Sequence, residues 1–142
     1  MKTIIITLIL LFLLNAGKTL AQQDTNKTNT KQTVTIEEEA FIVVEEMPEF
    51  PGGDDARVKF LLENIKYPQK ERINKTEGLV IVSFIVEKDG SITNVKVLKS
   101  ISPPLDAEAI RVIKSMPDWT PGKQKGKPVR VQINMPIRFS LN

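Results

Sequence analysis

The side chains able to do acid–base or nucleophilic chemistry are carboxylates, lysines and serines, because the 142-residue chain has no cysteine and no histidine. Their absence excludes thiol nucleophiles, Ser-His and Cys-His catalytic pairs, disulfides and the usual zinc sites. Asp106 and Glu108 could act as a carboxylate pair only if they faced each other, and residues two apart on a helix do not. We therefore expect a protein that is not an enzyme and that needs no cofactor.

A glycine pair, Gly52-Gly53, precedes a predicted helix, where free backbone N–H groups could bind a phosphate. Asp54 and Asp55 follow at once and would repel an anion, and no Lys-Ser or Lys-Thr pair comes after them. These glycines are better explained as a turn that leads into the helix.

The remaining chemistry is that of the peptide backbone at the edge of a sheet. Residues 129–139, VRVQINMPIRF, have apolar side chains at every odd position, which predicts a strand with one face on a core. Pro136 has no N–H to donate and is tolerated mainly in edge strands. We therefore expect an edge strand whose unpaired backbone groups another chain can use.

Two helices and two further strands are predicted around this strand. The first helix is expected to be capped by Asp54 or Gly53, to run to about Lys66 and to bury an apolar stripe, and the second spans residues 105–115. The two stripes consist of Val58, Leu61, Leu62 and Ile65, and of Ala109, Val112, Ile113 and Met116.

Residues 78–87 are apolar on both faces, which is typical of a central strand. A turn at residues 88–90 leads to a second, more polar strand, residues 91–100, in which the adjacent Val97 and Leu98 indicate a bulge. The predicted fold is α+β, a two-layer sandwich of a three-stranded antiparallel sheet with two helices on one face. Trp119 is expected in its core, and residues 123–127 in a mobile loop.

The N-terminal part divides into a leader and a tether. Residues 1–21 have a basic start and an eleven-residue apolar run, against the roughly 20 residues that span a bilayer. They predict a cleaved signal peptide or, alternatively, a short membrane anchor, and either places the domain outside the cytoplasm. Residues 22–46 are expected to be a polar and acidic tether, with a short strand at residues 40–44, and residues 47–142 the domain. Removing the leader lowers the formal charge from +3 to 3 − 2 = +1, so no nucleic-acid partner is expected.

Residues 47–139 resemble the carboxy-terminal domain of the TonB family, in the form common in Bacteroidetes-type energy transducers. The matching motifs occur in order over about two-thirds of the chain. They are MPEFPGG (47–53), Tyr67-Pro68, Gly78, the Asp89-Gly90 turn, LDAEA (105–109), WTPG (119–122) and GKPVRV (126–131).

The resemblance implies a periplasmic energy-transducer domain that docks a short extended segment, the TonB box, of a TonB-dependent outer-membrane receptor. Inner-membrane motor proteins are implied as partners only if the leader is uncleaved. Carried over by position, the partner-binding residues are Val129, Arg130, Val131, Gln132, Ile133, Asn134, Met135, Ile137 and Arg138 on the strand, and Asn64, Lys66, Tyr67, Pro68 and Gln69 beside it.

An alternative is a periplasmic scaffold that binds itself, as a homodimer, or the cell wall, without energy transduction. Leu79, Ile81 and Ile85 would form an apolar patch for it on the open face of the sheet unless residues 41–44 cover them.

Overall fold

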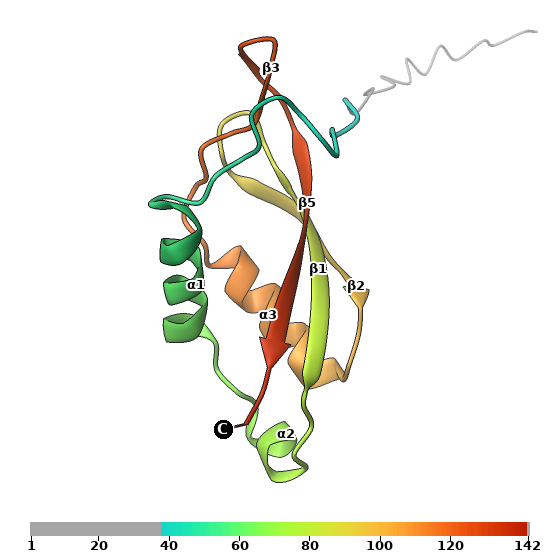
Figure 1. The fold of residues 1–142 in the computed structure, drawn as a ribbon. Coiled ribbons are helices and arrows are strands. Elements are labelled where there is room, and N and C mark those ends of the chain that lie inside the picture. Colours follow the sequence, from blue (N-terminus) through green and yellow to red (C-terminus); the bar gives the residue numbers. More distant parts are fainter. Residues whose placement is uncertain (1–37, 142) are drawn as a thin grey trace, which may run out of the picture. The chain divides into compact units, whose positions relative to one another are not determined.

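The computed structural model describes residues 38–141, and its three long strands form one antiparallel sheet. The central strand is β1 (Gly78–Val86), with β2 (Ile92–Lys99) on one side and β5 (Val131–Phe139) on the other (Figure 1). This order confirms the central strand and the two edge strands predicted from the sequence. The predicted leader and residues 22–37 of the predicted tether lie outside the described residues.

Two long helices, α1 (Gly53–Asn64) and α3 (Pro103–Lys114), pack against one face of this sheet. The α+β two-layer sandwich is therefore confirmed. Within residues 38–141, none of the helices combines the length and the apolarity that a membrane span requires.

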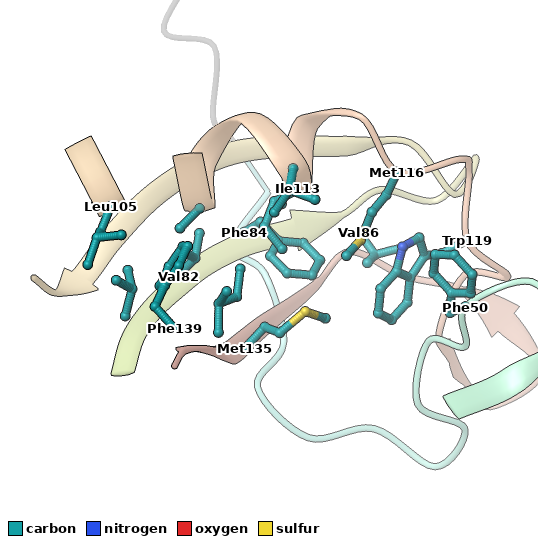
Figure 2. Packing of buried hydrophobic residues seen from close by; sticks show 14 residues of the cluster. Phe50, Val82, Phe84, Val86, Leu105, Ile113, Met116, Trp119, Met135 and Phe139 are labelled. Atoms are coloured by element: carbon teal, nitrogen blue, oxygen red, sulfur yellow. The ribbon is translucent and has the colours of Figure 1, made fainter. Parts of the chain in front are cut away.

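The core lies between the sheet and the helices, where alternate residues of β1 and β5 meet the apolar stripe of α3 (Figure 2). Trp119 is only 7% exposed, and its ring lies 5.7 Å from those of Phe50 and Phe84, so the predicted core position of the tryptophan is confirmed. The fully buried side chains of the core include Val80, Val82, Phe84, Val86, Leu105, Val112, Ile113, Val131, Ile137 and Phe139.

The β1–β2 hairpin has the turn and the bulge that its sequence predicts. Gly90 closes the turn with a φ of 89°, and its N–H donates to the carbonyl oxygen of Glu87 at 2.9 Å. A Cβ atom at Gly90 would lie 2.0 Å from the carbonyl oxygen of Trp119, so only glycine fits there. The register of the ladder shifts opposite Leu98, which confirms a bulge at Val97 and Leu98.

The predicted buried face of the first helix is wrong in part. Val58 is 48% exposed and Leu62 is 77% exposed, whereas Phe60 and Leu61 pack against the core. The helix is rotated so that Phe60 faces the core, because the ring of Phe60 contacts that of Phe50, at a centroid distance of 5.6 Å. The N-cap is Gly52, with a φ of 85°, rather than Gly53 or Asp54.

Three further segments differ from the sequence prediction. A short helix, α2 (Gln69–Ile73), follows the first long helix and was not expected. The predicted mobile loop is a small hairpin of β3 (Lys123–Gln124) and β4 (Lys127–Pro128). Residues 40–44 do not form a strand and contribute a single bridge, between Phe41 and β5.

Candidate functional site

One bridge at the outer edge of β5 shows which way the backbone N–H and C=O groups of the strand point. The N–H of Phe41 donates to the carbonyl oxygen of Arg130 at 2.8 Å, and the N–H of Gln132 donates to the carbonyl oxygen of Phe41 at 2.7 Å. Neighbouring residues of a strand point their backbone groups to opposite sides. The even-numbered residues of β5 therefore face outward, and the odd-numbered residues face β1.

The outward positions of β5 beyond Gln132 are Asn134, Pro136 and Arg138. The nitrogen of Pro136 lies on the outer side, so its missing N–H removes no hydrogen bond from the ladder with β1. Within residues 38–141, the backbone groups of these three residues make no hydrogen bond outside the ladder of the sheet. Two N–H donors and three carbonyl acceptors are thus available along this part of the edge.

The side chains of β5 follow the same alternation. Met135 and Ile137 are 2% and 1% exposed and belong to the core, whereas Asn134 and Arg138 are exposed. A partner at the edge could contact the exposed side chains directly. It could reach the buried residues only along the backbone of the strand. The predicted binding residues therefore divide into those with side chains that a partner can contact and those with side chains buried in the core.

Arg130, which was predicted to bind a partner, is held inside the domain. Its guanidinium donates two hydrogen bonds to the carboxylate of Glu87, at 2.8 and 3.1 Å, and a third to the carbonyl oxygen of Glu38. The Arg130 hydrogen bonds keep the pKa of Glu87 below its usual value, against the opposing effect of burial. Val129 is also held, because its N–H donates to the carbonyl oxygen of Gly122 at 3.0 Å. Both residues fix the start of the strand.

The predicted second segment, Asn64 to Gln69, is anchored on α3. The N–H of Lys66 donates to the carboxylate of Glu108 at 2.6 Å, and Arg111 donates to the carbonyl oxygen of Asn64 at 2.7 Å. Glu108 is 9% exposed and also receives hydrogen bonds from Arg111 at 2.6 and 2.8 Å. Burial tends to raise the pKa of Glu108, but these hydrogen bonds outweigh it and lower the pKa.

The two predicted regions meet at the C-terminal end of β5. The ring of Tyr67 packs edge-on against that of Phe139, with 5.7 Å between the ring centroids. The hydroxyl of Tyr67 donates to the carbonyl oxygen of Thr76. Pro68 is the N-cap of α2, and Gln69 is its first residue. The structure therefore brings this segment beside the end of the strand.

Two grooves lie beside the free part of the edge. The first, about 270 Å³, adjoins Asn134 and is bordered by Asp54 and Arg57 of α1, which form a salt bridge at 3.0 Å. The second, about 300 Å³, adjoins Arg138. A strand added to β5 could place side chains in both grooves. The other lining residues are Pro48, Trp119, Ile133, Met135 and Pro136 for the first, and Leu62, Ile65, Tyr67, Arg72, Phe139 and Ser140 for the second.

Sequence reasoning missed the roles of Phe41 and Glu108. A single bridge leaves no periodic signal, so nothing local marks Phe41 as a partner of β5. Glu108 did leave a signal, because it is a carboxylate beside Ala109 on the buried face of α3. In residues 38–141, no group of three or more acidic, histidine or cysteine side chains is arranged to hold a metal ion.

A two-layer α+β domain with an accessible sheet edge is a class of protein suited to binding an extended segment. The family model of the Gram-negative bacterial TonB protein C-terminal matches residues 63–141, more than half of the chain. The chain therefore belongs to the TonB C-terminal family, as its motifs suggested.

Two curated relatives are the TonB proteins of Helicobacter pylori strains ATCC 700392 / 26695 and J99 / ATCC 700824. Each is 36% identical over 77 residues, which is 54% of this chain and 26% of the relative. The chain thus matches about a quarter of the length of these relatives. The NMR solution structure of a Helicobacter pylori TonB-CTD is 29% identical, with a TM-score of 0.48, and the match covers 65% of this chain and 87% of that one.

Proposed function

We propose that this domain docks TonB-dependent outer-membrane receptors by adding an extended receptor segment, the TonB box, to the outer edge of β5. The protein acts, on this proposal, at the periplasmic side of an energy-coupled transport system. One observation carries the proposal. The edge already pairs with the chain itself at Phe41 through two backbone hydrogen bonds, and it leaves Asn134, Pro136 and Arg138 open.

Backbone pairing suits such a role because it depends weakly on the sequence of the guest. Each hydrogen bond in the added ladder contributes about 0.5–1.5 kcal/mol net. A few such bonds make a reversible contact that different receptors can share. The grooves beside Asn134 and Arg138 give the side chains of the guest a place to pack.

The electrostatics of the other sheet face favour this proposal over a self-associating scaffold. On that face the apolar side chains of Leu79, Ile81 and Ile85 are only partly exposed. The exposed Lys96 and Lys99 of β2 and Arg138 of β5 flank them. Two copies stacked on this face would bring like charges together at short range, which is unfavourable. A single species of one-chain mass in sedimentation at low ionic strength is the expected result.

The docking proposal is tested by NMR titration of ¹⁵N-labelled protein with a TonB-box peptide from one of the cell's own receptors. The outward amides of Asn134 and Arg138 should shift most, because they gain a hydrogen bond. A peptide with the same side chains but methylated backbone nitrogens is the control, and it should bind much more weakly. Shifts confined to the β3–β4 hairpin would show that the peptide binds elsewhere and would refute the proposal.

A further inference from the structure

The part of the edge next to the free positions is covered by the chain itself. Residues 38–46, here called the strap, cross the start of β5 and then run to the β3–β4 hairpin (Figure 1). The bridge from Phe41 occupies the carbonyl of Arg130 and the N–H of Gln132, which lie on the same outward edge of the strand as the groups of Asn134. The strap therefore sits where a longer guest strand would have to pair.

The hold of the strap on the strand is slight around this bridge. Phe41 is 41% exposed, and Ile42 and Val43 are 70% and 78% exposed, so few apolar contacts support the two hydrogen bonds. Glu38 adds an exposed salt bridge to Lys88, a type of contact that contributes little and weakens with salt, and its carbonyl oxygen accepts one hydrogen bond from the Arg130 guanidinium.

The chain beyond the bridge is attached more firmly. Val44 is 8% exposed, and Glu46 pairs with Lys123 through two backbone hydrogen bonds of 2.8 and 3.1 Å. Glu49 pairs with Thr120 in the same way. The strap can therefore lift from β5 up to Val44 while the rest of the domain stays in place.

The strand keeps its shape when the strap lifts, because Arg130 has a second anchor. Its bidentate pair with Glu87 joins β5 to the end of β1 and does not involve the strap. The carbonyl of Arg130 and the N–H of Gln132 would then be presented on a fixed strand. Preorganised groups of this kind bind a guest at a lower entropic cost.

We propose that the whole outer edge of β5 is one interaction surface for a long extended peptide, and that the strap is its intramolecular competitor. This proposal rests on the proposed docking function and adds a length dependence to it. A short guest pairs with Asn134 to Arg138 beside the strap. A guest that reaches Gln132 and Arg130 must first displace Phe41.

The test compares two peptides on the full chain. The short probe is a TonB-box peptide cut to the part opposite Asn134 to Arg138. The long probes are the same peptide lengthened with alternating Thr and Val, at either end in turn, to the 9 residues of β5. Their Kd values are measured by titration calorimetry, and the Gln132 amide is followed by NMR.

The decisive variant is Phe41→Pro, which removes the N–H that bonds Arg130, and Val43→Pro is the matched control at an exposed position of the strap. Phe41→Pro should tighten binding of the long probe that reaches Gln132 about tenfold, which equals 1.4 kcal/mol. It should leave the short probe unchanged, and Val43→Pro should change neither. Phe41→Gly keeps the N–H and should act in the same direction more weakly, which guards against misfolding of the proline variant.

The outcomes separate this inference from the function on which it rests. A short probe that binds, together with a long probe whose affinity is the same in Phe41→Pro and in the unmodified protein, overturns the competitor role and leaves docking intact. Failure of every probe to bind the unmodified protein and both Phe41 variants overturns docking itself, and the strap proposal with it.

Discussion

The N–H of Asn134 is the most direct single-atom test of docking at the β5 edge. Asn134→Pro deletes one outward donor without touching the ladder with β1, because that N–H faces away from β1. The side chain of Asn134 is exposed, and the preceding residue, Ile133, is already in the extended conformation that a following proline prefers. The domain should therefore stay folded.

The size of the expected effect follows from the one hydrogen bond that is lost. A backbone hydrogen bond to a guest is worth about 0.5–1.5 kcal/mol, so the Kd of a TonB-box peptide should rise roughly 2- to 13-fold. The free energy of unfolding should change by less than about 1 kcal/mol, since the one intramolecular hydrogen bond removed is the exposed, 3.3 Å bond that the Gln132 side chain donates to the Asn134 side chain.

The assay is titration calorimetry with the peptide, together with urea unfolding of each variant. Asn134→Ala is the matched control, because it removes the same side chain and keeps the N–H. Met135→Pro provides the opposite control, since its N–H faces β1 and its loss should unfold the domain. Equal peptide affinity of Asn134→Pro and Asn134→Ala, with both folded, would refute backbone pairing at this position.

Two further predictions concern the stability of the domain. Burial raises the pKa of Glu108, but its hydrogen bonds with Arg111 and with the backbone N–H of Lys66 lower the pKa more. The ionised carboxylate therefore stabilises the fold above about pH 4.5, and this stability is lost as the pH falls below that value. Glu108→Gln should cost about 1–3 kcal/mol in urea unfolding at pH 7 and much less at pH 3, and a loss independent of pH would contradict this. Gly90→Ala should cost more than about 2 kcal/mol because its Cβ would meet the carbonyl of Trp119, whereas Gly126→Ala, at a φ of 73° with open space around it, should cost about 1 kcal/mol. Equal melting temperatures of the two alanine variants would refute the clash.

Local patterns predicted the sheet because each carries a physical constraint on its own. The double apolar character of β1 favours the centre of a sheet, and Pro136 favours an edge. The structure adds the reason why the proline is tolerated within a strand paired along its whole length: its nitrogen falls at an outward position. Adding or removing one residue before Pro136 would turn that nitrogen toward β1.

The face of α1 could not be predicted in the same way, because its stripe is ambiguous. Apolar residues occur all round the helix, so the position of its neighbours decides which of them are buried. The ring of Phe50, which lies outside the helix, packs against Phe60, whereas Leu62 stays exposed. The bridge of Phe41 depends likewise on a partner about ninety residues away, and no local period records such a contact.

A strand edge that receives a guest must also avoid pairing with another copy of itself. Pro136 disfavours such self-pairing, because two β5 edges paired with each other would each bring a residue without an N–H into the new ladder. The exposed, charged Arg138 adds like-charge repulsion to the same pairing. The strap shortens the exposed edge from the other end by covering Arg130 and Gln132. What stays open is a short stretch that a complementary guest can complete, whereas a second copy of the strand would pair with it poorly.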